Sequence, residues 1–167
     1  MENRRPLIAG NWKLFKTATE AAETAAQLAN RLSGPINVDV MIAPPFTALS
    51  AVADVLKDSA VALGAQNLFW EDEGAFTGEI SPPMLKAAGC AYVIIGHSER
   101  RQYFGETDQS VNKRIKAALS HEMIPVFCIG ESEKERDADE TFSVLDKQAA
   151  KGLEGFSPDE LLSLIHI

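Results

Sequence analysis

Short, continuously apolar runs alternate with amphipathic segments along this chain of 167 residues. The runs predict five strands, which cover residues 7–11, 38–43, 60–64, 92–96 and 124–129. Because these runs lack polar alternation, they are typical of parallel strands that are buried on both faces. Their spacing leaves one helix between successive strands. The pattern therefore predicts an α/β fold built from βα units with right-handed crossovers.

The segments between the predicted strands begin and end with residues that start and stop helices. Thr17-Ala-Thr-Glu20 is a capping box and predicts a helix that runs to about Leu32. Ser81-Pro82 predicts another helix, with proline at its first position. Residues 66–78 are too long and too rich in glycine, acidic and aromatic residues for a simple connection. This segment is therefore predicted to be a functional loop.

Polar residues with chemical potential follow the carboxyl ends of the predicted strands. They are Asn11, Lys13, Gln66, His97 and Glu131. In a barrel of parallel strands this end is the catalytic face. The apolar pattern alone fits both a barrel and a doubly wound sheet. No glycine-rich dinucleotide or P-loop pattern follows any predicted strand, so a barrel is the favoured fold.

His97 is the residue whose placement indicates an enzyme. The apolar run Tyr92–Ile95 ends at Gly96 and brings His97 to the start of a helix that we expect Ser98 to cap. A helix N-terminus favours the neutral imidazole, which can donate a hydrogen bond to a carbonyl that gains negative charge. A lone histidine is more often structural, but this position favours catalysis. His121, by contrast, is expected to be solvated.

Three further side chains near these strand ends have both a functional and a structural interpretation. A lysine after a strand is usually a solvated surface residue, but Asn11 and Trp12 indicate the wall of a pocket around Lys13. There its ammonium would be a fixed cation for a phosphate or an oxyanion. Glu99 is either stabilised by the helix dipole or paired with Lys13. Cys128 is most simply a small core residue of the fifth strand.

Composition narrows the classes of function. With 46% hydrophobic and 24% charged residues the chain is predicted to form one globular domain. A net charge of -8 argues against nucleic acid and anionic membrane surfaces as partners. Cys90 and Cys128 lie far apart without a Cys/His cluster, so neither a disulfide framework nor a metal site is expected. No signal-peptide core or membrane-length apolar run occurs, and we expect a cytoplasmic protein.

Four sequence blocks together resemble the triosephosphate isomerase family, in that family's order and spacing. The blocks are Gly10-Asn-Trp-Lys13, Gly74-Ala-Phe-Thr-Gly-Glu79, Ile94-Ile-Gly-His-Ser-Glu-Arg-Arg101 and Pro125-Val-Phe-Cys-Ile-Gly-Glu131. The resemblance implies a (β/α)8 barrel. It also implies an isomerase of glycolysis and gluconeogenesis that interconverts dihydroxyacetone phosphate and glyceraldehyde 3-phosphate through an enediolate, without a cofactor or a metal ion.

The resemblance also assigns roles to individual residues. It implies that Asn11 and Lys13 bind the substrate and that Lys13 acts electrostatically. His97 would be the neutral electrophile that stabilises the enediolate, a chemistry already known of this family. The residues with supporting roles near the site would be Ser98, Glu99 and Cys128.

The Gln66–Gly78 loop resembles the dimer loop of the family. The resemblance implies a homodimer of the full-length enzyme, in which Thr77 reaches the Asn11–Lys13 region of the neighbouring subunit. It also suggests that Glu79 pairs with Arg100.

The chain departs from the family pattern near its end. A barrel of this kind has eight strands in about 250 residues, whereas five βα units and the start of a sixth helix are predicted here. The sixth strand with its glutamate base, the lid and the phosphate loops have no counterpart, so we expect the chain alone to be inactive. Residues 1–161 would be a partial barrel domain.

The last six residues, Leu162-Ser-Leu-Ile-His-Ile167, are expected to be a non-native tail. They match the translation of a transposase recognition end that is used in sequencing-library adapters. An ordinary amphipathic helix end is the alternative. For the function, two alternatives stay open: a short, non-catalytic binding partner of the full-length enzyme, and another phosphate-sugar barrel enzyme. The His-Ser-Glu-Arg-Arg block argues against the latter.

Overall fold

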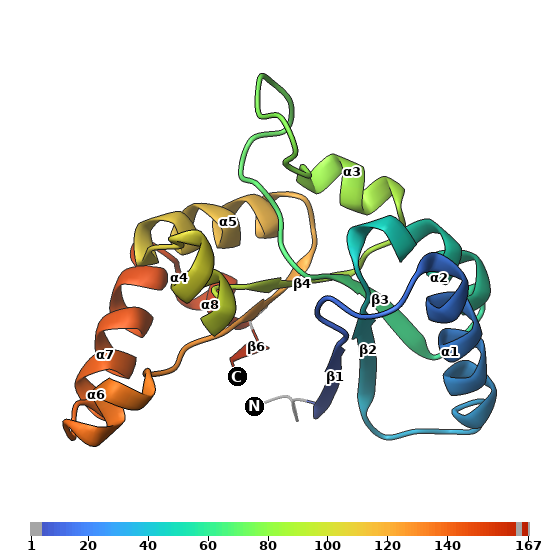
Figure 1. Cartoon of the computed structure of the whole chain (residues 1–167), viewed down its shortest axis with the longest axis horizontal. Helices are drawn as coiled ribbons and strands as arrows, with labels where there is room; N and C mark the ends of the chain where they lie inside the picture. The colour runs from blue at the N-terminus through green and yellow to red at the C-terminus, as the bar shows by residue number, and fades with distance from the viewer. Residues whose placement is uncertain (1–4, 163–164, 167) are drawn as a thin grey trace.

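The computed structural model describes residues 5–162 and 165–166. Its strands pair in parallel, each with the next one along the chain, and form one sheet. Figure 1 shows this sheet as an arch with helices on its convex side, which is the geometry of a half-barrel. The strands are β1 (Leu7–Asn11), β2 (Asp39–Ala43), β3 (Val61–Ala65), β4 (Tyr92–Ile95), β5 (Ile124–Phe127) and β6 (Ile165–His166).

The helices follow the strands in the expected order. They are α1 (Ala18–Arg31), η1 (Phe46–Ala48), α2 (Leu49–Leu56), α3 (Pro82–Ala87), α4 (Ser98–Phe104), α5 (Asp108–Ser120), α6 (Glu133–Asp137), α7 (Thr141–Gly152) and α8 (Pro158–Leu162). The capping box at the start of α1 is confirmed. The Glu20 carboxylate accepts the N–H of Thr17 at 2.8 Å, and the Thr17 hydroxyl accepts the N–H of Glu20.

Burial on both faces of the sheet explains the continuously apolar runs. In β2, Val40 and Ile42 belong to the core beneath the helices, whereas Met41 and Ala43 belong to a second cluster on the concave side. All four are buried. Complete burial of such a side chain contributes about 1.5–3 kcal/mol. A strand that is buried on only one face would gain this free energy from only half of its side chains. Its sequence would alternate between apolar and polar residues, and β2 shows no such alternation.

A sixth strand joins the five that the sequence predicts. In β6, Ile165 and His166 pair with Val126 and Phe127 of β5. This strand lies within 162–167, the segment expected to be a non-native tail. Residues 163, 164 and 167 of that segment lie outside the described residues. Its non-native origin stays a prediction.

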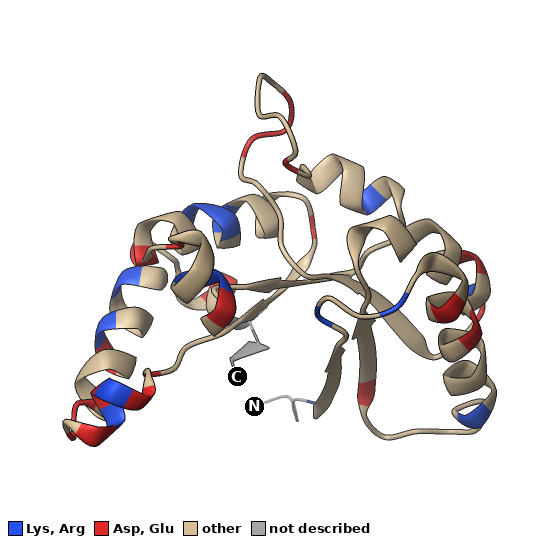
Figure 2. Cartoon of the chain, in the orientation of Figure 1, with Lys and Arg blue, Asp and Glu red and all other residues tan. Residues whose placement is uncertain are grey.

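The segment between β3 and α3 protrudes from the body at the top of Figure 1. Its base is closed by a backbone hydrogen bond from the N–H of Phe69 to the carbonyl of Ile80 at 2.8 Å. Figure 2 shows acidic residues along this protrusion and charged residues on the outer helices, whereas the strands carry few charges. Within the described part of the chain no helix is long and apolar enough to cross a membrane.

Candidate active site

The ends of the first three strands are joined through Gln66. Its side-chain amide donates to the carbonyl of Lys13 at 2.8 Å and to the carbonyl of Ala43 at 2.9 Å. The side chain of Asn11 accepts the N–H of Lys13 at 3.0 Å. Lys13 has a φ of 52°, in the left-handed region, a conformation that costs on the order of 1 to 3 kcal/mol for a residue with a side chain. These bonds hold the Lys13 backbone in that conformation at the edge of the site.

His97 itself caps helix α4, so the expectation that Ser98 is the cap is wrong. The backbone of His97 is extended, with φ -55° and ψ 141°, and Ser98 is already the first helical residue. The ring Nδ1 of His97 accepts the N–H of Glu99 at 3.3 Å, the bond that a cap hydroxyl would otherwise make. Because Nδ1 is an acceptor, this bond assigns the ring proton to Nε2, in the neutral form.

The Glu99 carboxylate lies between Lys13 and His97. It accepts from Nζ of Lys13 at 2.8 Å, and its other oxygen lies 3.5 Å from Nδ1 of His97. The hydrogen bond from Lys13 lowers the pKa of Glu99 below its ordinary value. The pairing of Glu99 with Lys13 is therefore the interpretation that the geometry favours.

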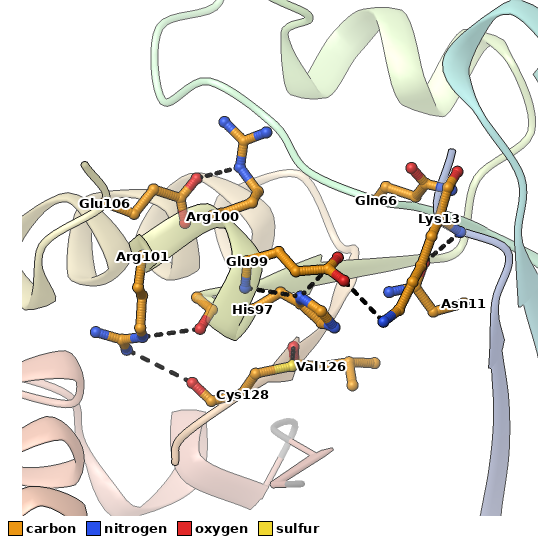
Figure 3. Close-up of polar contacts among 11 residues, drawn as sticks. Asn11, Lys13, Gln66, His97, Glu99, Arg100, Arg101, Glu106, Val126 and Cys128 are labelled. Carbon is orange, nitrogen blue, oxygen red and sulfur yellow. Dashed lines mark hydrogen bonds and ion pairs between the residues drawn. The ribbon is translucent and has the colours of Figure 1, made fainter. Parts of the chain in front are cut away.

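Figure 3 shows these side chains converging from three segments of the chain. Beside them lies a cleft of about 510 Å³. One part of its lining is polar and includes Asn11, Lys13 and His97. An ammonium group and a neutral N–H donor that line one cleft can together stabilise an oxyanion or a phosphate.

The other part of the cleft lining is apolar and exposed. It includes Leu14, which is 94% exposed, Tyr103 at 68% and Phe104 at 67%. Exposed apolar patches of this kind mark binding surfaces. Gln66 lies at the polar end of the cleft, whereas Thr77 is exposed on the protruding loop and outside the lining. Within the one chain, the two predicted dimer-loop residues are therefore not brought together.

Arg101 is a site residue that the sequence analysis missed. Its guanidinium donates to the carbonyl of Gly96 at 2.8 Å and to that of Cys128 at 3.5 Å, and it pairs with Asp108 at 2.7 Å. It thereby ties the end of β4, next to His97, to the segment after β5. The sequence held one signal for this pair: Asp108 follows Arg101 by seven residues, and Arg101 lies in the short helix after a strand.

The Cys128 thiol is adjacent to this tie and is half-buried. Burial raises its pKa to about 11, so the thiol stays protonated at neutral pH. Its Sγ lies 3.8 Å from the carbonyl of Val126, which its S–H can reach. Cys128 therefore packs beside the site as a protonated thiol at neutral pH. Across the described residues, no group of three or more His, Cys, Asp and Glu side chains is arranged to hold a metal ion.

Two further contacts differ from the expected ones. Arg100 pairs with Glu106, not with Glu79. The reason is burial, because the Glu106 side chain is only 2% exposed and its charge needs a cationic partner. Arg114 lies 3.6 Å from the same carboxylate oxygen.

The expectation that His121 is solvated is not met in full. Its ring is 25% exposed and lies 3.2 Å from the carboxylate of Asp72.

The curled parallel sheet, with its polar side chains gathered at the carboxyl ends of the strands, defines part of a (β/α) barrel. The sequence model of the triosephosphate isomerase family matches residues 6–165. The chain belongs to the triosephosphate isomerase family.

Individual relatives agree with this assignment. Triosephosphate isomerase of Geobacter metallireducens is 54% identical over 162 residues, which are 97% of this chain and 64% of the relative. That of Moorella thermoacetica is 49% identical over 97% of this chain and 65% of the relative. The crystal structure of triosephosphate isomerase from Bartonella henselae superposes with a TM-score of 0.88 at 36% identity, over 98% of this chain and 67% of that chain. This chain therefore spans just under two thirds of the length of the first two relatives.

Proposed function

We propose that this chain contributes Asn11, Lys13 and His97 to an active site that interconverts dihydroxyacetone phosphate and glyceraldehyde 3-phosphate, a step of glycolysis and gluconeogenesis. One observation carries the proposal. His97 and Lys13 line the same cleft, and Nδ1 of His97 is occupied by the N–H of Glu99. This leaves Nε2–H of the neutral ring free to donate to a substrate oxygen.

The chemistry of aldose–ketose interconversion explains why these two groups would suffice on this side of the site. Removal of a proton from carbon beside the carbonyl turns the carbonyl oxygen into the oxyanion of an enediolate. Nε2–H of His97 donates to that oxygen, and the Lys13 ammonium stabilises the charge of the enediolate and of the phosphate. Asn11 holds the Lys13 backbone and lines the cleft beside the substrate.

The base that removes the carbon proton is proposed to lie outside these 167 residues. Glu99 lines the cleft, but its pKa is lowered by the hydrogen bond from Lys13, which makes it a weak base. The family resemblance implies a glutamate on a sixth barrel strand for this role. We therefore propose that the 167-residue chain alone does not isomerise triose phosphates measurably.

A chimera tests this division of roles. Residues 1–161 would be joined to the remaining third of the Geobacter metallireducens relative, which is 54% identical to this chain where the two align. The chimera is expected to isomerise triose phosphates in a coupled assay, whereas the 167-residue chain is expected to stay at the buffer rate. An inactive but folded chimera, or an active chain, would each contradict the proposal. A folded, active chimera would also support 161 as the domain boundary.

We propose a homodimer as the working state of the complete enzyme. The apolar part of the cleft is exposed, and the protruding loop carries an aromatic cluster in which the ring centroids of Phe69 and Phe76 lie 4.6 Å apart. Contact between the aromatic loop of a second copy and this apolar surface would remove both from water, which is favourable. Thr77 would then approach Lys13 of the neighbouring subunit.

The same two surfaces favour one alternative function, a non-catalytic partner of a full-length isomerase. Neither the loop nor the apolar cleft needs the missing base. The alternative predicts that the 167-residue chain co-purifies with a full-length isomerase and changes its activity.

We also propose a cytoplasmic location, which is supported by Cys90 and Cys128. Both are free thiols, as expected in a reducing compartment.

A further inference from the structure

The segment that follows β5 is held by one side chain of α7. Gln148 makes two hydrogen bonds with the backbone of Gly130, which lies 18 positions earlier in the chain. The side-chain Oε1 accepts the N–H of Gly130 at 2.9 Å, and Nε2 donates to the carbonyl of Gly130 at 2.9 Å. One side-chain amide thus pairs with one residue as the backbone of a neighbouring strand would.

Packing does not hold Gly130 in place. The residue borders a cleft of about 960 Å³, which is lined by residues of α4, α5, α6 and α7. Outside its chain neighbours, a Cβ added at Gly130 would meet no atom of the described residues within 4 Å. Its neighbour Glu131, one of the polar residues predicted at strand ends, pairs with Arg136 of α6 at 2.8 Å. The two bonds of Gln148 therefore fix Gly130 where contacts between side chains do not.

Helix α7 is a rigid support for Gln148. The side-chain amide of Asn112 of α5 donates to the carbonyls of Gly152 and Glu154, each at 3.0 Å. A Cβ added at Gly152 would lie 2.6 Å from the ring of Phe127, so the last turn of α7 lies directly against β5. Gln148 lies one helical turn before this anchored end. Its side chain therefore starts from a fixed position relative to the sheet.

The segment held by Gln148 lies against the backbone that carries His97. The N–H of Cys128 donates to the carbonyl of Ile95 at 2.9 Å. Gly96 has a φ of 75°, and a Cβ added there would lie 3.1 Å from the carbonyl oxygen of Cys128. Arg101 donates to the carbonyls of both Gly96 and Cys128 (Figure 3). A displacement of the segment after β5 would therefore displace the residue before His97.

We propose that Gln148 is a positioning residue for His97. It holds Gly130, and through the close contact of Cys128 with Gly96 it holds the end of β4 from which the imidazole projects. The catalytic consequence rests on the proposed function. Misplacement of a catalytic group by about 1 Å can lower a rate by about a hundredfold. Loss of the two bonds of Gln148 should loosen the end of β4 and lower turnover by less than that.

Hydrogen exchange in the 167-residue chain tests the structural part of this role. Gln148→Met keeps the length of the side chain and removes both hydrogen bonds, and the half-buried position should accept it. The N–H of Glu99 donates to Nδ1 of His97, so its exchange rate reports the placement of the ring. Gln148→Met should raise the exchange rates of the Gly130 and Glu99 amides about threefold or more.

Gln27→Met is the matched control, because Gln27 is an exposed residue of α1. It should leave both exchange rates unchanged, and Gln148→Met should leave the amides of α1 unchanged. Faster exchange at Gly130 without faster exchange at Glu99 would overturn the positioning role. Equal acceleration of the α1 amides by Gln148→Met would overturn it as well, because it would show a general loosening of the fold.

Kinetics of the active chimera test the catalytic part. Gln148→Met should lower kcat about five- to twentyfold and change KM by less than about twofold, because the imidazole acts on the developing oxyanion. In the His97→Gln background the same substitution should change kcat by less than about twofold. Equal losses of kcat in both backgrounds would overturn the positioning role. An inactive but folded chimera would contradict the proposed function, whereas the exchange rates of Gly130 and Glu99 would still decide the role of Gln148.

Discussion

Gln66 and Lys13 are 53 residues apart in the chain, and the side-chain amide of the first donates a 2.8 Å hydrogen bond to the backbone carbonyl of the second. The same amide donates to Ala43, so one side chain fixes the ends of β1 and β2 from the end of β3. A glutamate has the same shape but cannot donate. The placement of the candidate cation therefore depends on the amide of a residue that the sequence assigned to the dimer loop.

We expect Gln66→Glu to destabilise the fold by about 1–3 kcal/mol, because it removes the donor to the Lys13 carbonyl and one of the two donors to the Ala43 carbonyl, which also accepts the N–H of Trp12, and adds a charge beside them. Urea unfolding followed by circular dichroism measures the change. Gln102→Glu, the same substitution at an exposed position of α4, is the control and should change stability by less than about 0.5 kcal/mol. Equal effects of the two substitutions would show that the bonds of Gln66 to Lys13 and Ala43 contribute nothing.

His97→Gln in the active chimera should lower kcat by about a hundredfold or more, because it replaces the imidazole N–H aimed at the developing oxyanion by a less acidic and differently placed amide N–H. Lys13→Ala should lower kcat and raise KM, since its charge acts on both the bound phosphate and the transition state. Steady-state kinetics with both triose phosphates measure these changes. Turnover near that of the parent chimera in either variant would remove the site assignment.

Arg101→Met is expected to unfold the chain or to destabilise it by about 3–5 kcal/mol, because it leaves Asp108 as a mostly buried charge without its partner. The Asp108 side chain is 12% exposed. The double variant Arg101→Met/Asp108→Leu should be more stable than Arg101→Met alone. Thermal unfolding of the single and double variants gives the comparison, and strictly additive losses would refute the coupling between the two side chains.

The sequence predicts those parts of the fold that burial determines. It predicts less well the contacts between side chains that lie on different segments of the chain. Five strand positions follow from runs that are apolar on both faces, and each is confirmed to within two residues. His97 was predicted at a strand end, but its role as cap was not, because sequence preference assigns caps to hydroxyls and amides. The Arg101–Asp108 and His121–Asp72 pairs were missed, since both depend on how loops turn after the strands.

The two thiols provide a pH-dependent prediction. Burial raises the pKa of Cys90 to about 12 and that of Cys128 to about 11. Alkylation by iodoacetamide at pH 8 should therefore be about a hundredfold slower, or more, in the folded chain than in urea. In the unfolded state the thiols lose their protons near their ordinary pKa, whereas in the folded state they keep them. Stability should accordingly fall as the pH rises above about 9. Rapid labelling of the folded chain would contradict the burial of both thiols.

The exposed apolar wall of the cleft provides the last prediction. Tyr103 is 68% exposed and lines the cleft together with Leu14, which is 94% exposed. Exposed apolar surface that gathers in one place marks an interaction site. Tyr103→Asp should weaken self-association of the active chimera at least tenfold, because a carboxylate would be desolvated wherever the loop of a second copy docks. Sedimentation velocity across a dilution series measures this change. Phe142→Asp, at an aromatic position on α7 that is 80% exposed, is the control and should leave the association unchanged. If Phe142→Asp dissociated the chimera and Tyr103→Asp did not, the second copy would dock on α7 and not in the cleft.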